Sequence, residues 1–201
     1  MKKIILAAII CASTISAGCG LAEEKIYPYP FNSARIEYTS PTDADAKTVV
    51  TIKGDKELFQ TTGKSNTLMI INKEKIYYIN LDSKTGTMAQ NQTYAELKKL
   101  PKANRINYLM GVTIGLKETK NGMDLPAATG KKQIAGQTCD EYVSNTVGKV
   151  CLWNALPLEI NSEAMGGGTL SAVANKVEVN IDVPDSVFDL PSGIEIKDLS
   201  A

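Results

Sequence analysis

The sequence contains no histidine among its 201 residues. Histidine is the usual general base and metal ligand near neutral pH, so those roles would fall to carboxylates, lysine or tyrosine. The sequence also lacks a nucleophile elbow, a phosphate-binding loop and a zinc signature. The triple glycine at 166–168 fits a hairpin turn, since no strand-to-helix change follows it. We therefore expect a protein that is not an enzyme and that needs no metal or other cofactor.

The sequence has no excess of either charge, with 22 Lys and Arg residues and 22 Asp and Glu residues. Loss of Lys2 and Lys3 with an N-terminal signal would leave 20 basic against 22 acidic residues. No basic patch is evident, which argues against binding to nucleic acid and against electrostatic docking on a membrane. After the N-terminus, no apolar run approaches the length of a transmembrane helix.

The N-terminus has the pattern of a bacterial export signal. Lys2 and Lys3 precede the apolar run Ile4–Ile10, and small residues then lead to Cys19. The apolar run is long enough for the hydrophobic region of a signal peptide and too short to span a membrane. The sequence therefore predicts export from the cytoplasm into an oxidising compartment.

Two cleavage sites are consistent with this signal. In the first, residues 15–19 are a lipobox, the signal peptide is 1–18, and Cys19 becomes acylated, which gives a periplasm-facing membrane lipoprotein. Ser16 departs from the lipobox pattern, where Leu is most frequent. In the second, residues 20–22 are a small-x-small site, the signal peptide is 1–22, and the product is a soluble periplasmic protein. We favour acylation at Cys19 because the signal is short and small residues crowd this cysteine.

The number of cysteines that remain after cleavage of the signal favours one disulfide. Either cleavage removes Cys11, and Cys19 is then acylated or removed, which leaves Cys139 and Cys151. In an oxidising compartment these two are expected to pair, and two unpaired buried cysteines are the alternative. Their spacing does not match a metal site, and no histidine is present to complete one.

A hairpin would explain how the two cysteines meet. Placing Cys139 opposite Cys151 also sets Glu141 opposite Lys149 and residue 143 opposite residue 147, both valines. Opposite-charge and apolar pairs of this kind stabilise antiparallel strands. We therefore predict this register, with a turn around residues 144–146 and a bulge at Gly148.

Apolar and polar residues alternate over much of the chain, which predicts β-strands. The predicted strands lie near residues 34–39, 46–52, 57–61, 67–71, 75–81 and 173–183. The strands at 67–71 and 75–81 are joined by a short polar link and are apolar on both faces. We expect them in the middle of an antiparallel sheet, with something covering each side. Residues 122–136 have the composition of a loop.

Two short helices interrupt the strands. Thr93–Glu96 fits a capping box, and this helix would end before Pro101. A second helix is predicted over about 103–116, where apolar residues recur at helical spacing. A helical lid on a sheet encloses a ligand cavity wherever side chains do not fill the space, and the alternative is a plain core. The candidate lining residues are Met69, Ile71, Tyr77, Ile79, Leu109, Met110 and Ile114.

Five segments occur in a characteristic order along the chain, namely 79–87, 134–142, 148–153, 156–160 and 183–191. Together they resemble an exported bacterial domain-of-unknown-function family that is similar in fold to the lipoprotein carriers LolA and LolB. The resemblance covers about residues 34–197 and implies a single mainly β (α+β) domain, preceded by a linker at 19–33. It implies a curved antiparallel sheet, or incomplete β-barrel, with a short helical lid. In the carriers this interior holds acyl chains, but no carrier motif matches here position by position, so no carrier binding residue is transferred.

Two functions follow from these patterns. The first is an exported, lipid-anchored binder of a lipid or lipoprotein acyl chain, with the membrane contacted through the lipid on Cys19. The second is a non-catalytic envelope interaction or structural protein with a filled core, whose protein partner the sequence does not identify.

The intact mass of the mature protein from its native host tests the N-terminal predictions. We expect the mass of a chain beginning at Cys19 plus acyl groups, reduced by two hydrogens for a Cys139–Cys151 disulfide. An unmodified chain beginning at Glu23 would instead establish the second cleavage site.

Overall fold

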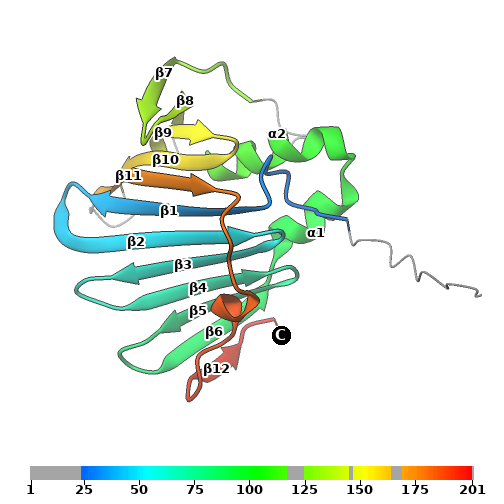
Figure 1. Ribbon diagram of the computed structural model, residues 1–201. Helices are drawn as coiled ribbons and strands as arrows, with labels where there is room; N and C mark the ends of the chain where they lie inside the picture. Colours follow the sequence, from blue (N-terminus) through cyan, green and yellow to red (C-terminus); the bar gives the residue numbers. More distant parts are fainter. Residues whose placement is uncertain (1–23, 117–124, 145–146, 164–168, 201) are drawn as a thin grey trace, which may run out of the picture.

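The structure, a computed structural model, describes residues 24–116, 125–144, 147–163 and 169–200. Its strands form one twelve-stranded sheet in the order β12-β6-β5-β4-β3-β2-β1-β11-β10-β9-β8-β7 (Figure 1). Neighbouring strands are antiparallel except that β12 runs parallel to β6. The sheet is therefore mixed, and the prediction of a purely antiparallel sheet is wrong at this edge. The predicted signal peptide, Cys19 and the predicted hairpin turn at 166–168 lie outside the described residues.

The strands are β1 (Ser33–Ser40), β2 (Asp43–Lys53), β3 (Lys56–Thr62), β4 (Thr67–Asn72), β5 (Lys75–Asn80), β6 (Thr85–Gln90), β7 (Gly130–Ile134), β8 (Gln137–Ser144), β9 (Gly148–Trp153), β10 (Leu156–Glu163), β11 (Thr169–Val179) and β12 (Glu195–Asp198). The helices are α1 (Gln92–Lys99), α2 (Lys102–Thr113) and the short 3₁₀ helix η1 (Asp185–Phe188). Among the described residues, no helix is long and apolar enough to cross a membrane.

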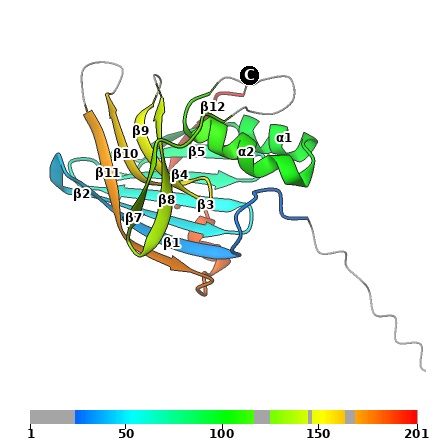
Figure 2. The same ribbon diagram turned by 90° about the horizontal axis from the view of Figure 1, so that it is seen from above.

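The sheet curls toward the side on which the two α-helices lie. Figure 2 shows β9–β11 rising on the same side as α1 and α2, with β1–β4 below them. The edge strands β7 and β12 stand at opposite ends of the strand order. The predicted mainly β fold, with a curved open sheet and a short helical cover, agrees with this arrangement.

The β4–β5 hairpin forms as predicted, and its two faces have different cover. Ile70 and Ile79 face the convex side and are almost fully buried. There they pack with Leu58, Val183 and Phe188 in a second core. The segment after β11 crosses this convex face on its way to η1 and β12 (Figure 1). The other face of the hairpin is turned toward the helices.

Two predicted strand limits differ from the structure. Residues 130–134, predicted as loop, form the edge strand β7 by pairing with β8. The last long strand ends at Val179 rather than at residue 183, because Asn180 turns into left-handed backbone with φ of 54°. Asparagine tolerates this conformation better than the β-branched residues beside it.

The first helix begins differently from the capping-box prediction. The N-cap is Asn91, two residues before Thr93, and its side-chain Oδ1 accepts a hydrogen bond from the Tyr94 backbone N–H at 3.0 Å. The Asn91 Nδ2 group also donates to the Lys73 carbonyl at 2.7 Å. Asn91 Nδ2 also donates to the Tyr27 hydroxyl at 3.1 Å, so this one side chain caps α1 and donates two hydrogen bonds, whereas a threonine hydroxyl has a single proton to donate.

The hairpin of β8 and β9 carries the predicted disulfide in a shifted register. Cys139 and Cys151 are bonded, with Cα atoms 5.4 Å apart. Cys151 lies opposite Glu141, and Ser144 lies opposite Gly148, so the pairing is shifted by two residues from the predicted register. Residues 145 and 146 of the predicted turn lie outside the described residues. Gly148 has φ of 76°, which glycine adopts most readily and which places the turn at this position.

This shift in register leaves the side chains of β8 and β9 on the faces that were predicted for them. The cysteines become diagonal neighbours instead of direct partners, and Lys149 still forms an ion pair with Glu141 at 2.8 Å. The predicted pairing of the two valines is wrong, since Val143 lies opposite Lys149. A change of register by an even number keeps every side chain on its original face.

Replacing Cys139 and Cys151 together with alanine should lower the free energy of unfolding by about 3 kcal/mol at most, the loop-closure value for so short a loop. The measurement is urea denaturation. The chemically reduced wild type is the matched control, because it lacks the bond but keeps both cysteine side chains in place. An unchanged midpoint in both proteins would contradict a stabilising role for this bond.

Candidate ligand cavity

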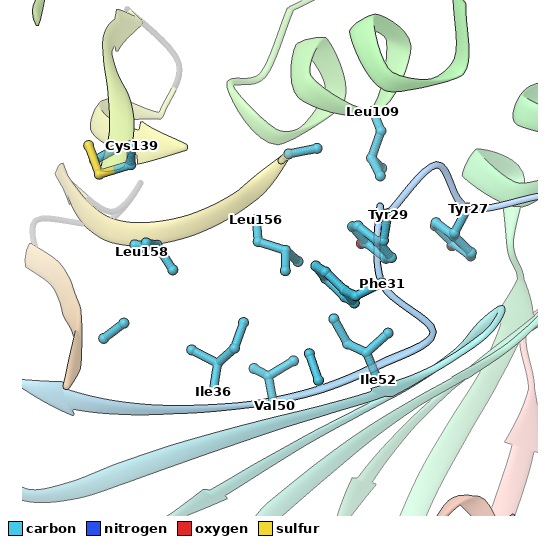
Figure 3. Packing of buried hydrophobic residues seen from close by; sticks show 14 of the residues in the cluster. Tyr27, Tyr29, Phe31, Ile36, Val50, Ile52, Leu109, Cys139, Leu156 and Leu158 are labelled. Carbon is cyan, nitrogen blue, oxygen red and sulfur yellow. A yellow bond between two sulfur atoms is a disulfide. The ribbon is translucent and has the colours of Figure 1, made fainter. Parts of the chain in front are cut away.

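The N-terminal segment (residues 24–32) is packed inside the fold, so it is not the linker that the sequence predicts for 19–33. Its backbone alternates, and Tyr27, Tyr29 and Phe31 all point inward and are buried. Figure 3 shows these three side chains between β1 and β2 on one side and α2 on the other. The segment thus forms part of the core on the concave side of the sheet.

The inward aromatic rings form a stacked row. The Tyr27 and Tyr29 rings are 5.8 Å apart and nearly parallel, and the Tyr29 and Phe31 rings are 5.4 Å apart. Tyr94 of α1 and Trp153 of β9 continue the row at its two ends. Offset stacks at such distances add to the stabilisation from apolar burial. The row therefore joins the helices to the curled end of the sheet.

Buried polar groups hold the N-terminal segment in place. The Asp55 carboxylate accepts hydrogen bonds from the backbone N–H groups of Ile26 and Tyr27 at 2.8–3.0 Å. Arg105 of α2, 6% exposed, donates to the Glu24 carboxylate at 2.8 Å. These hydrogen bonds engage the backbone N–H groups of the buried residues Ile26 and Tyr27 and the guanidinium of the buried Arg105, so the segment is fixed at defined points.

A cavity of about 390 Å³ remains between α2 and the concave face of the sheet. Its lining is mostly apolar and comes from the N-terminal segment, β1–β5, the start of α1, α2, the β9–β10 turn, β10 and β11. The lining residues are Tyr27, Tyr29, Tyr38, Thr48, Val50, Glu57, Phe59, Ile71, Ile76, Asn91, Thr93, Leu109, Val112, Thr113, Ala155, Leu156, Pro157, Ile160 and Ala172. A concave, mainly apolar site with a few polar groups is the usual form of a small-molecule pocket.

The cavity adjoins a wider trough of about 1020 Å³ on the sheet. Thr48 and Phe59 line both spaces, so the trough is the continuation of the cavity beyond Phe59. Along β3, Glu57, Phe59 and Thr61 face the same side, because successive strand residues alternate. The path thus runs from Glu57 at one end, across Phe59, to the threonine-rich floor of the trough.

Glu57 contributes a buried carboxyl group to the mainly apolar lining of the cavity. It is 4% exposed, and its Oε1 accepts a hydrogen bond from the Tyr29 hydroxyl at 2.8 Å. Burial raises the pKa of Glu57 to about 7, the Tyr29 hydrogen bond opposes this rise, and the Asp55 charge adds to it. The carboxyl therefore changes charge near neutral pH.

The neighbouring tyrosines remain protonated. Burial and the Glu57 charge raise the pKa of Tyr27, Tyr29 and Tyr38 above the usual range. The Tyr38 hydroxyl donates to the Pro157 carbonyl at 2.9 Å, and the Tyr27 hydroxyl accepts from the Asn91 side chain at 3.1 Å. These hydroxyls therefore act as neutral hydrogen-bonding groups.

The structure separates the seven residues that the sequence predicts as cavity lining. Ile71 and Leu109 line the cavity, and Met69 lines the adjoining trough. Tyr77 and Ile79 belong to the opposite, convex face, although Ile79 also borders the trough. Ile114 packs in a separate cluster with Tyr142, Val150 and Leu152, and Met110 packs against both this cluster and the main core.

These differences have simple physical causes. Tyr77 and Ile79 alternate with the residues that face the helices, so a strand apolar on both faces cannot have all its apolar residues in one cavity. Ile114 lies just beyond the end of α2, where it turns toward β8 and β9.

The polar end of the cavity was not predicted from the sequence. The alternation of aromatic residues with Pro28 and Pro30 in the N-terminal segment was the available signal, since it marks an extended strand with one apolar face. Glu57 gave no signal of its own, because a carboxylate in a strand is normally expected in solvent.

No protein-family model matches the chain, and the search of curated proteins finds no match. Among solved structures, the chain is similar to an uncharacterized conserved protein from Thermus thermophilus, with 6% identity and a TM-score of 0.52. That match covers 87% of this chain and 94% of the other. A second structure, PNGF-II, has 12% identity and a TM-score of 0.51, and the match covers 85% of this chain but 32% of PNGF-II. At these identities the likeness concerns the fold alone.

Glu57 should make the protein less stable as the pH rises. The group titrates at 4.5 in its ordinary state and has a pKa of about 7 in the fold. The folded protein therefore holds more protons between these values, and stability falls as the pH rises through about 7. The full effect is on the order of 3 kcal/mol.

The Glu57→Gln variant tests this assignment, because glutamine keeps an acceptor for Tyr29 and removes the charge. Urea denaturation from pH about 5 to about 8.5 should show a smaller fall in stability for the variant than for the wild type. Glu37→Gln is the matched control, because Glu37 lies in β1 on the convex face of the sheet, away from the cavity. This variant should keep the wild-type dependence of stability on pH. Equal slopes for all three proteins would refute the assignment.

Proposed function

We propose that this protein is an exported, lipid-anchored envelope protein that holds the apolar chain of a lipid or lipoprotein in the cavity beneath α2. The observation that carries the proposal is the unfilled, mainly apolar cavity of about 390 Å³ next to an open trough. Pockets for small ligands commonly measure about 300–1,000 Å³. An extended chain in the cavity could continue across Phe59 into the trough.

The proposal includes a LolA-like arrangement. An open curved sheet with helices over its concave face supports it, as does the ordered set of resembling segments between residues 79 and 191. Acylation at Cys19 would fix the protein to a membrane facing the periplasm. A tethered protein can receive or hold a lipid but cannot cross the periplasm, so we infer a stationary binder and not a shuttle.

A role as an interaction protein with a filled core is the alternative. That role requires an interior closed by side chains, and the cavity beneath α2 does not meet this expectation. We therefore favour lipid binding.

Filling the cavity should abolish binding. Ala172→Phe places a ring into the lining from β11, and uptake of a fluorescent fatty acid or an acylated peptide by delipidated protein should fall at least about tenfold. Ala44→Phe makes the same substitution at an exposed position of β2 and should bind as the wild type does.

A second variant separates loss of binding from loss of folding. Val112 of α2 lines the cavity and is 36% exposed, so Val112→Trp can block the space from the helix side with little effect on the core. Unfolding temperatures identify any misfolded variant. Absence of uptake by the wild-type protein would refute the proposal.

A further inference from the structure

The inner end of the cavity is chemically unlike its walls. Its walls are formed by side chains such as Val50, Ile71 and Leu109, whereas Glu57 brings a carboxyl group to this end. Within the described part of the chain, this carboxyl accepts its hydrogen bond from the Tyr29 hydroxyl, at Oε1. The second oxygen, Oε2, therefore has capacity to accept a hydrogen bond from a ligand.

Among the residues that the structure describes, none forms an ion pair with Glu57. The charged group that bears on it is Asp55, another carboxylate, and the tyrosines at positions 27, 29 and 38 are neutral. The β4, β5 and α2 residues of the lining carry no ionisable side chain. A buried carboxylate without a cationic partner is unfavourable, and a cation placed beside it relieves that cost.

We propose that the cavity selects ligands carrying a protonated amine, which Glu57 binds through Oε2 while the attached alkyl chain runs over Phe59 toward the trough. This inference rests on the proposed function and specifies the ligand class. The spacing fits such a ligand: Glu57 and Phe59 are two residues apart on one face of β3, or about 7 Å. The amine could belong to a simple alkylamine or to the ethanolamine headgroup of a lipid.

The polar network around Glu57 positions it for this role. The Tyr29 hydroxyl donates its single proton to Oε1, so the carboxyl keeps one orientation, and Tyr29 is itself fixed by the aromatic row. Asn91 holds the adjacent Tyr27 hydroxyl. The carboxyl is therefore presented to the cavity by groups that are already in place before a ligand enters.

Calorimetric titration of delipidated protein with decylamine, decanol and decanoate tests the proposal. At pH about 8.5, where Glu57 is ionised, the amine should bind about tenfold more tightly than the alcohol, and the acid more weakly. At pH about 5.5 the preference for the amine should be largely lost, because Glu57 is then neutral. Ethanolamine and choline lysophospholipids form a second pair of probes. A preference for ethanolamine over choline points to a lipid headgroup, since choline has no N–H to donate.

Two variants assign the preference to this carboxyl. Glu57→Gln should bind amine and alcohol equally at both pH values and should still bind decanol, while Glu37→Gln should behave as the wild type. Tyr29→Phe should move the midpoint of the amine pH profile upward, because it removes a hydrogen bond that holds the pKa of Glu57 down.

The outcomes distinguish the two proposals. If decanol binds and the amine has no advantage, or if Glu57→Gln keeps that advantage, amine selection is refuted while the apolar cavity remains a binding site. If none of the three compounds binds, both proposals fail.

Discussion

The packing of the N-terminal segment against the concave face is the constraint on which the rest of the structure depends. Tyr27, Tyr29 and Phe31 occupy the space that a strongly curved sheet leaves between its strands and its helices. The helices are short and bury few residues of their own, so they require this intervening layer. Asn91 and Arg105 connect the two helices to the segment by hydrogen bonds, and the positions of the helices therefore follow from where the segment lies.

The same segment explains why a cavity exists. Its rings cover the β1–β2 part of the concave face but do not extend over Ile71 or Ile76, which remain exposed to the space beneath α2. Glu57 stands at the boundary between the filled and the unfilled part. A buried carboxyl there reduces stability above neutral pH, and a leucine of similar size would not. Groups whose burial reduces stability occur often at binding sites, and this is the reason for proposing that Glu57 serves a ligand.

The sequence predicted those features that depend on local pattern. Alternation located the β4–β5 hairpin, helical spacing located α2, and cysteine counting paired Cys139 with Cys151. Features that depend on tertiary contact were missed or misplaced. The register of the β8–β9 hairpin depended on the backbone conformation of Gly148. The face occupied by Ile79 depended on which side of the sheet the C-terminal segment covers. Glu57 was not predictable as a site residue because its burial results from the N-terminal segment, whose contact with it lies 28 residues earlier in the chain.

The C-terminal segment links the two faces of the sheet. Six strands, β1–β6, separate β11 from β12, so the chain must cross the sheet to reach the far edge. It crosses on the convex face, where Val183 and Phe188 cover Ile70 and Ile79. Lys53 and Lys56 hold η1 there through Asp185, whose pKa their hydrogen bonds lower. At the far edge β12 adds Glu195 and Lys197 to the wall of the trough. The element that completes the convex core therefore also extends the concave surface along which a bound chain would lie.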